Sequence, residues 1–290
     1  MTILAESGAT KTDWRSIASD GTVYSMRSTG MNVATADVAF VEKTLREAIP
    51  KLNPSGETVE RIHFYAAGMI STPGNPVPEG AVRLHGEFMK AFPEAKVAYA
   101  SDLLAAARAL FGRKPGIAVI LGTGSNSCEY DGEQIVKNVR SGGFILGDEG
   151  GGASLGRQFV SDFLKGIVPE PVASEFAAKY DMEYFHVVKN VYRGLSPASY
   201  LGSFAPFIME HYDSCLYVKC LVDNNFRALF ERCLLQYDIE GKPVGVVGGF
   251  GFAHKEILLR VAQEYGVGIS DIVSSPIEGL VKYYIEENEN

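Results

Sequence analysis

The sequence predicts an α/β protein built from two similar halves. Short apolar runs alternate with segments of helical periodicity, and a turn rich in glycine and threonine follows an apolar run in each half. The runs expected to form strands are Ile3–Ala5, Ile62–Ala66, Val97–Tyr99, Ile117–Leu121 and Val244–Val247. The segments expected to form helices are 37–52, 103–111, 154–165, 220–237, 255–265 and 276–287.

Each half opens with the same order of elements. Met1–Glu6 is expected as the first strand, Ser7–Thr12 follows it, and Asp20-Gly21 comes after a further alternating stretch. In the second half, Gly122–Ser127 follows the apolar run and Asp131-Gly132 comes after a short stretch. Because Asp-Gly between strand-like runs is a strong hairpin signal, each half is predicted to begin as strand, small-residue turn, strand, Asp-Gly turn and strand.

The composition excludes several classes of partner. The formal net charge is −8 at pH 7, so we expect neither a nucleic-acid binder nor a membrane-surface binder, since both partners are anionic. No apolar run approaches the roughly 18 residues of a membrane span, and no signal peptide is recognisable, so the expected location is cytoplasmic. The four cysteines form no CxxC pair and no zinc-spaced cluster, and four scattered buried thiols are expected.

The two small-residue turns have the chemistry of phosphate-binding loops. Glycine has no Cβ to block an approaching anion, successive main-chain N–H groups form a concave donor set, and hydroxyls add donors. Lys11 either contributes charge to the first turn or points to solvent. Each turn taken alone is better explained as an ordinary tight turn, and neither matches the Walker A or GxGxxG pattern. Their placement after equivalent strands in both halves favours phosphate binding.

Glu6–Trp14, Gly122–Ser127 and Val247–Gly251 are three motifs whose order spans nearly the whole chain. They resemble the first phosphate, second phosphate and glycine-rich adenosine motifs of the BadF/BadG/BcrA/BcrD ATPase family, in its N-acetylglucosamine kinase-like branch. That family belongs to the sugar kinase–Hsp70–actin superfamily. The second motif together with the later Gly147–Gly150 is the most specific part of the resemblance.

The resemblance implies two actin-like, ribonuclease H-like lobes, each a mixed sheet flanked by helices, with an interlobe cleft. The N-terminal lobe is expected to cover residues 1–113 and the C-terminal lobe residues 114–270. A C-terminal helix within 271–290 is expected to pack back on the first lobe.

ATP and Mg²⁺ are the cofactors that the resemblance implies. The residues it assigns to the nucleotide are Gly8, Thr10, Lys11, Thr12, Gly122, Thr123, Gly124, Ser125, Gly202, Gly248, Gly249, Phe250, Gly251 and Phe252. Gly202 reads equally well as a helix-packing glycine. The metal is expected at Glu6, in the family often through water, and at Asp102.

The first motif departs from the family pattern, which usually begins with aspartate and two or three glycines. Glu6 keeps the carboxylate but lengthens the side chain by one methylene. Ser7 and Ala9 are expected to add side-chain atoms beside the phosphate path. These changes are expected to affect catalytic rate and nucleotide affinity more than the fold.

Asp102 is the candidate general base. It stands at a predicted strand-to-helix junction, where aspartate and serine are also good helix N-caps. Phosphoryl transfer to a sugar hydroxyl needs a carboxylate within reach of the nucleophilic oxygen, and the resembling family has one at this junction. The two roles conflict only if the carboxylate is committed to the helix backbone, and Ser101 could cap instead.

The sugar is expected to contact polar groups from both halves. The residues that the resemblance implies are Asn32, Asn126, Ser141, Gly142, Gly143 and Asp148. A fixed carboxylate such as that of Asp148 accepts hydrogen bonds from neighbouring hydroxyls, and the Asn32 amide offers both donor and acceptor. Ala67-Gly68 replaces a more polar family position, which leaves the exact sugar open.

The function expected from these features is an ATP-dependent kinase of an amino sugar, N-acetylglucosamine first, giving the 6-phosphate. The expected partners are a small-molecule sugar and ATP, with no nucleic acid and no membrane, and a homodimer is left open. Two alternatives remain: an ATPase that activates a partner enzyme, as some BadF/BadG relatives do, and a non-catalytic sugar or nucleotide sensor.

Overall fold

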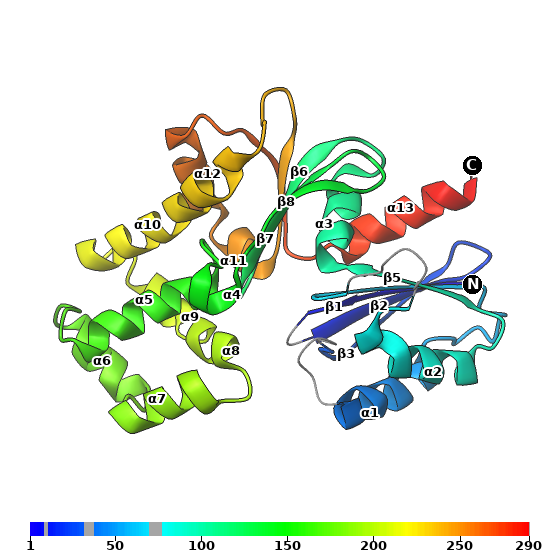
Figure 1. Cartoon of the computed structure of the whole chain (residues 1–290), viewed down its shortest axis with the longest axis horizontal. Coiled ribbons are helices and arrows are strands. Elements are labelled where there is room, and N and C mark those ends of the chain that lie inside the picture. Colours follow the sequence, from blue (N-terminus) through cyan, green and yellow to red (C-terminus); the bar gives the residue numbers. More distant parts are fainter. Residues whose placement is uncertain (9–10, 32–37, 70–76, 290) are drawn as a thin grey trace. The chain divides into compact units, whose positions relative to one another are not determined.

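The computed structural model describes residues 1–8, 11–31, 38–69 and 77–289. It contains two compact units, each built on a five-stranded mixed sheet (Figure 1). Unit 1 comprises Met1–Lys114, Gly132–Gln134 and Ser275–Asn290, and unit 2 comprises Pro115–Asp131 and Ile135–Ser274. The α/β fold class with two similar sheets, expected from the repeated hairpin pattern, is confirmed.

The sheet of unit 1 has the strand order β3-β2-β1-β4-β5. Its strands are β1 (Thr2–Ser7), β2 (Lys11–Ile17), β3 (Val23–Thr29), β4 (Arg61–Ala66) and β5 (Lys96–Ser101). The first three form an antiparallel meander, whereas β4 and β5 run parallel to β1. The central strand β1 is apolar on both faces, with Ile3 and Leu4 fully buried, which requires covering layers on both sides of the sheet.

Helices supply these two layers. They are α1 (Val38–Ala48) with the 3₁₀ turn η1 (Ile49–Lys51), η2 (Glu79–Ala81), α2 (Val82–Ala91), α3 (Asp102–Phe111) and α13 (Ile277–Glu289). On one face Trp14, Phe64 and Phe88 pack edge-on or tilted in a core shared with α1 and α2. On the other face Leu4 and Tyr65 belong to a second core that includes residues of α3 and α13.

Unit 2 repeats the same sheet topology, with the order β10-β9-β6-β7-β8. Its strands are β6 (Gly116–Leu121), β7 (Ser125–Tyr130), β8 (Ile135–Val139), β9 (Val244–Val247) and β10 (Ile269–Val273). Again a central strand, β6, is antiparallel to the next strand in sequence and parallel to a later one. The helices are α4 (Gly143–Leu146), α5 (Gly152–Leu164), α6 (Val172–Lys179), α7 (Tyr184–Arg193), α8 (Pro197–Gly202), α9 (Ala205–Glu210), α10 (Leu216–Arg232), η3 (Leu234–Gln236), α11 (Gly249–Ala253) and α12 (Lys255–Glu264).

Two sequence expectations need correction. The helix expected at 220–237 begins earlier and ends earlier, as α10, because the chain tightens into the 3₁₀ turn η3 after Cys233. The thiols are not all buried: Cys220 is exposed and Cys215 is partly exposed, whereas Cys128 and Cys233 are buried. Over the described ranges, none of the helices has both the length and the apolar character needed to cross a membrane.

Helix α13 packs closely on α3 at a glycine. A Cβ on Gly279 would lie 2.4 Å from the carbonyl oxygen of Ala109 and 2.8 Å from its Cα, so no side chain fits without moving one helix. Gly86 in α2 is the opposite case, because a Cβ there meets nothing within 4 Å. Gly279 is therefore expected to set the distance between the two helices.

We predict that Gly279→Ala destabilises the protein by about 1–3 kcal/mol through overpacking. The matched change Gly86→Ala is expected to stabilise by up to about 1 kcal/mol, because alanine is the better helix former. Urea denaturation followed by circular dichroism measures both. Equal effects of the two substitutions would contradict the close α3–α13 contact.

Candidate active site

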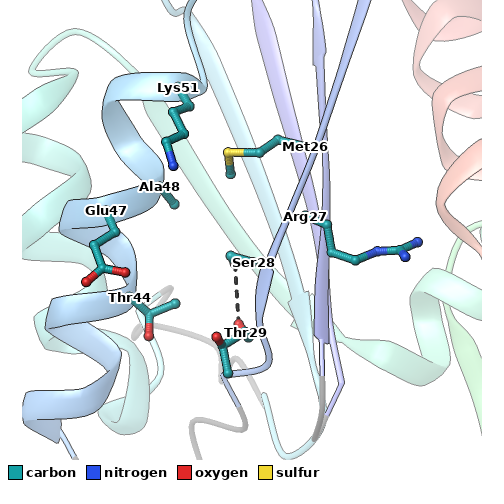
Figure 2. A pocket seen from close by; sticks show the side chains of 8 residues that line it. All are labelled: Met26, Arg27, Ser28, Thr29, Thr44, Glu47, Ala48 and Lys51. Carbon is teal, nitrogen blue, oxygen red and sulfur yellow. Dashed lines mark hydrogen bonds between the residues drawn. The ribbon is translucent and has the colours of Figure 1, made fainter.

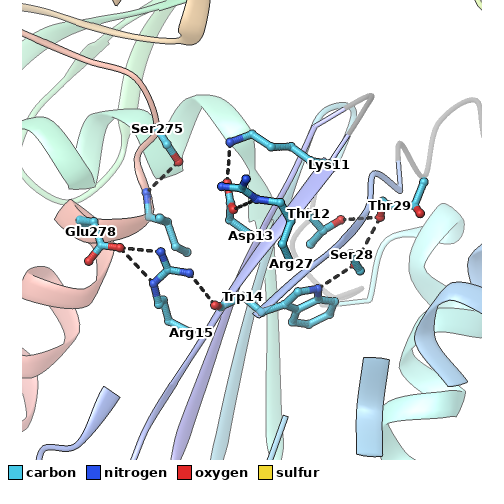
Figure 3. A network of polar contacts seen from close by, with 11 residues as sticks. Lys11, Thr12, Asp13, Trp14, Arg15, Arg27, Ser28, Thr29, Ser275 and Glu278 are labelled. Carbon is cyan, nitrogen blue, oxygen red and sulfur yellow. Dashed lines mark hydrogen bonds and ion pairs between the residues drawn. The ribbon is translucent and has the colours of Figure 1, made fainter. Parts of the chain in front are cut away.

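Charged side chains line the face of the unit 1 sheet that α3 and α13 cover. Glu6 on β1 is the register partner of Asp13 on β2, and Asp13 is in turn the partner of Arg27 on β3. Paired residues on neighbouring strands project to the same face, as do residues two apart on one strand, so Lys11 belongs to this face as well. Figure 3 shows Lys11 and Arg27 converging on Asp13.

Asp13 is the most enclosed member of this group, with 3% of its side chain exposed. Its Oδ2 lies 2.7 Å from Lys11 Nζ and its Oδ1 lies 2.8 Å from Arg27 Nε. These two cations hold the pKa of Asp13 below its usual range, although burial acts in the opposite direction. Asp13 is therefore a buried, ionised carboxylate, a feature that the sequence predictions missed. The signal was present, because Lys11, Asp13 and Arg15 alternate with Thr12 and Trp14 along β2.

Glu6 and Asp102 form the acidic part of the site. Burial raises the pKa of Glu6 to about 7, with further contributions from the negative charges of Asp102 and Asp13, while Lys11 acts in the opposite direction. Burial also raises the pKa of Asp102. The two carboxyl groups lie at the carboxyl ends of β1 and β5, which run in the same direction, and this common edge is what brings them together.

At the junction of β5 and α3, Ser101 and Asp102 both accept hydrogen bonds from the start of the helix. Ser101 is the N-cap of α3, and its hydroxyl accepts a hydrogen bond from Leu104 N at 3.2 Å. Asp102 accepts from Leu103 N through Oδ1 at 2.9 Å. The N-cap position of α3 is thus taken by Ser101, and Asp102 follows it as the first residue of the helix.

A buried polar cluster fixes the helix that begins at Asp102. Arg108 of α3 donates to the hydroxyls of Tyr65 on β4 and Tyr284 on α13, at 2.8 and 3.3 Å. The two hydroxyls are also hydrogen-bonded to each other. One guanidinium therefore ties together the sheet, α3 and the C-terminal helix behind the candidate base.

The first small-residue turn is closed by a hydrogen bond from Gly8 N to the Lys11 carbonyl at 2.9 Å. Thr12 does not face outward: its hydroxyl is buried, lies 2.7 Å from Ser7 Oγ and donates to the Thr29 carbonyl. Ser7 is equally buried, donates to the Met31 carbonyl and accepts from Met31 N. The expectation that Ser7 adds atoms beside a phosphate path is therefore wrong, since its side chain points into the protein.

Three residues with expected roles lie outside the described residues. They are Ala9 and Thr10 of the first turn and Asn32 of the expected sugar site. Glu6, Gly8 and Lys11 are thus the described residues of the first motif that remain candidates for ligand contact.

In unit 2, three glycine-containing segments meet at the carboxyl ends of β6 and β9. The carbonyls of Gly122 and Thr123 accept hydrogen bonds from the first turn of α5, from Gly152 N at 2.9 Å and Ala153 N at 2.8 Å. A Cβ on Gly248 would lie 2.4 Å from the carbonyl oxygen of Leu121, so the loop after β9 rests directly on the end of β6. The predicted second phosphate and adenosine motifs are therefore neighbours.

The remaining residues assigned to the nucleotide surround this junction. A Cβ on Gly202 would lie 3.0 Å from the Thr123 methyl group, so this glycine packs against the second phosphate turn. Phe250 stacks at a tilt on Phe226, with ring centroids 5.7 Å apart. Gly251 is buried, whereas Gly249 and Phe252 are exposed.

Asp148 lies against the second phosphate turn. Its Oδ1 accepts from Ser125 N at 3.3 Å, and a Cβ on Gly124 would fall 2.8 Å from its Oδ2. The residue has a φ of 55°, a left-handed conformation that costs on the order of 1 kcal/mol for aspartate. Burial raises the pKa of this carboxyl, with a smaller contribution from Glu149. A strained, buried carboxylate beside a small-residue turn is typical of a functional position.

The other expected sugar contacts are less enclosed. Asn126 Oδ1 accepts from Ser127 N and from the Asn138 side chain, at 2.9 and 3.0 Å, so its amide orientation is fixed. The Ser141 carbonyl accepts from Asp148 N at 3.0 Å. Gly142 and Gly143 follow with φ values of 73° and 71°, which shape the main chain ahead of Asp148.

The donor set near Glu6 fits a magnesium ion that is shared with a nucleotide. Over the described ranges, no group of three His, Cys, Asp or Glu side chains is arranged to hold a metal by itself. Mg²⁺ usually needs only one or two carboxylates, with waters and phosphate oxygens completing the shell. Burial, and after it the negative charges of Asp102 and Asp13, raise the pKa of Glu6, and a bound cation would favour its ionised form.

A separate hollow of about 130 Å³ lies between β3 and α1. Thr44 and Glu47 of α1 and Lys51 of η1 border it on one side. Ser28 and Thr29 border it from the strand, while the side chain of Arg27 points away from it (Figure 2). It contains none of the residues assigned to nucleotide, sugar or metal.

The solved structure of a putative N-acetylglucosamine kinase from Porphyromonas gingivalis is 36% identical to this chain. The match covers 99% of this chain and 100% of that one, with a TM-score of 0.89. The chain belongs to the same family as that protein. No protein-family model and no curated protein sequence matches the chain.

Structures with lower sequence identity share the fold of this chain. A putative N-acetylglucosamine kinase from Chromobacterium violaceum is 20% identical over 97% of this chain and 98% of its own, with a TM-score of 0.68. A ROK family glucokinase from Streptomyces griseus, solved with glucose and AMPPNP, is 14% identical over 100% and 99% of the two chains, with a TM-score of 0.59. This chain therefore has the two-lobe, actin-like fold of sugar kinases.

The raised pKa of Glu6 gives a stability prediction with a definite sign. The folded state holds a proton that the unfolded state releases between about pH 4.5 and 7, so the stabilising contribution of this proton is lost as pH rises through that window. We predict that Glu6→Gln stabilises the protein at pH 8 by about 1–3 kcal/mol and changes little at pH 5. Thermal unfolding at the two pH values, with the exposed Glu94→Gln as control, measures this. A gain that is equal at both pH values would contradict it.

Gly248 and Gly249 form a matched pair for testing the loop after β9. Gly248 has a φ of 138° and no room for a Cβ, whereas a Cβ on Gly249 meets nothing within 4 Å. We predict that Gly248→Ala lowers the unfolding free energy by about 1–3 kcal/mol and that Gly249→Ala leaves it within about 0.5 kcal/mol. Chemical denaturation distinguishes them, and a silent Gly248→Ala would contradict the close approach to Leu121.

Proposed function

We propose that this protein is an ATP-dependent sugar kinase that phosphorylates an amino sugar, N-acetylglucosamine, at the 6-hydroxyl. The observation that carries the proposal is the carboxylate of Asp102, which lies beside Glu6 while Ser101 makes the helix cap. Membership of the family of the P. gingivalis protein supports the same activity. The glycine-rich junction at the ends of β6 and β9 supports nucleotide binding.

In the proposed reaction, Asp102 accepts the proton of the sugar hydroxyl as its oxygen bonds to the γ-phosphorus. The bond from the γ-phosphorus to the bridging oxygen breaks, and ADP leaves. Burial raises the pKa of Asp102, which makes the ionised carboxylate a stronger base. The Ser101 cap and the Arg108 cluster keep α3, and with it the carboxylate, in a fixed position.

In this proposal, the candidates for phosphate contact lie in the two phosphate motifs. The described candidates are Gly8 and Lys11 in the first motif and Gly122–Ser125 in the second. Thr12 is assigned no contact, because its hydroxyl is already satisfied inside the protein. Glu6 and Asp102 would hold Mg²⁺, which when bound neutralises phosphate charge. Gly202 and the segment Gly248–Phe252 would border the nucleotide.

The sugar contacts proposed here are Asp148, Asn126 and the Ser141–Gly143 segment, together with Asn32. Asp148 is the strongest of these, because its carboxylate is buried and its conformation is strained. Such a carboxylate accepts hydrogen bonds from ring hydroxyls without further ordering.

We predict that ATP consumption depends on N-acetylglucosamine and falls about 10²–10⁴-fold in Asp102→Asn, which keeps the shape of the side chain but cannot accept the proton. A coupled assay of ADP release with a panel of hexoses and amino sugars measures this. Asp20→Asn, which changes an exposed aspartate in the β2–β3 turn, is the control. Turnover retained by Asp102→Asn would overturn the assignment of the base, and sugar binding without any turnover in the unmodified protein would favour a sensor.

A further inference from the structure

Asp13 has no part in the proposed chemistry, and yet it is among the most enclosed charged groups of unit 1. A buried carboxylate is costly unless it is paired and hydrogen-bonded. Here both oxygens are paired, each with a different cation. The two cations are more open to solvent, Lys11 at 43% and Arg27 at 67% side-chain exposure. Asp13 is thus the buried partner of two exposed cations.

Lys11 belongs to the first turn through its main chain. Its carbonyl accepts the hydrogen bond from Gly8 N that closes the turn, so its side chain starts at the turn proposed to face phosphate. A lysine side chain is long and flexible, and Glu6 offers a competing negative charge. Lys11 already favours the ionised form of Glu6, which shows that the ammonium and this carboxyl are within electrostatic range.

Arg27 completes the arrangement from the edge strand. It approaches Asp13 from β3 and points away from the hollow beside α1 (Figures 2 and 3). With Arg27 on one oxygen and Lys11 on the other, the carboxylate of Asp13 has a fixed orientation. The Lys11 ammonium is consequently held at Asp13.

We propose that Asp13 is a positioning residue that holds the Lys11 ammonium for contact with a nucleotide phosphate and keeps it from neutralising Glu6. This inference rests on the proposed function, since it assumes that the first turn receives the phosphates of a nucleotide. It assigns the binding effect of Asp13 to Lys11 and not to direct contact with the ligand.

A double-mutant cycle on nucleotide binding tests this assignment. The magnesium complex of AMPPNP is titrated by calorimetry into the full chain and into Lys11→Met, Asp13→Asn and the double variant. We expect each single change to weaken binding about tenfold, the effect of losing one charge-assisted contact. The double variant is expected to stay within about twofold of Lys11→Met, because Asp13 has nothing left to position.

Arg15→Gln is the matched control. Arg15 lies on the same strand and the same face, two residues from Asp13, but it pairs with Glu278 of α13 (Figure 3). The affinity of the Arg15→Gln variant for the nucleotide is expected to equal that of the unmodified protein. If Asp13→Asn does not fold, Asp13→Ser, which also removes the charge, replaces it in the cycle under the same criterion.

Kinetics separate positioning from a general structural effect. Asp13→Asn is expected to raise the KM for ATP about tenfold and to leave the KM for the sugar unchanged, whereas a loosened fold would raise both. Unchanged nucleotide affinity in Asp13→Asn, or effects of the two substitutions that multiply to about a hundredfold, would overturn the proposal.

The same measurements distinguish failure of the inference from failure of the proposed function. Nucleotide binding without sugar-dependent turnover in the unmodified protein would overturn the kinase proposal, while the binding cycle still decides the role of Asp13. If the unmodified protein turns over the sugar but the losses of nucleotide affinity in the two single variants multiply in the double variant, only the role of Asp13 would be overturned. Absence of nucleotide binding in the unmodified protein would overturn both.

Discussion

The central position of β1 is the constraint on which the first lobe depends. This strand pairs antiparallel with β2 on one side and parallel with β4 on the other. The parallel pairing sets the carboxyl ends of β1, β4 and β5 along one edge, so that Glu6 and Asp102 come together although they are far apart in the sequence. The antiparallel pairing sets Asp13 beside Glu6. Strand β6 imposes the same geometry in the second lobe, where the loops after β6 and β9 become neighbours.

Concentrating charge at this edge works against stability, and the surrounding packing offsets it. Asp13 is stabilised by two cations. Among the described residues no cation is hydrogen-bonded to Glu6, and burial raises the pKa of Glu6 to about 7. Behind the charges, the Arg108 guanidinium donates to the tyrosine hydroxyls of β4 and α13, and Gly279 lets α13 lie directly on α3. Rigid support beneath an electrostatically strained site is the arrangement expected of a preorganised site.

The sequence revealed the framework because local patterns decide it. The run Ile117–Leu121 and the Asp-Gly turns carry strand and hairpin signals that tertiary contacts do not override. Helix α7 was not predicted, since its aromatic and β-branched residues, such as Tyr184, Phe185 and Val187, have strand-like propensities. The direction of the side chains in β2 could not be predicted from the sequence. Alternation places Thr12 and Lys11 on opposite faces of the strand, but it does not say which of them faces the interior. That depends on the Met31 segment, which β1 contacts only in the folded chain.

The structure changes the meaning of the altered first motif. Ser7, where the resembling family usually has glycine, places its hydroxyl inside the protein and binds both main-chain groups of Met31. It thereby joins the end of β1 to the segment after β3 and does not obstruct the outer face of the turn. Among the described residues of the motif, the departure that bears on chemistry is therefore Glu6 alone. Because glutamate carries its charge one methylene farther from the main chain than aspartate does, this departure alters the reach of a single carboxylate and leaves the rest of the charged face to Asp13, Lys11 and Asp102.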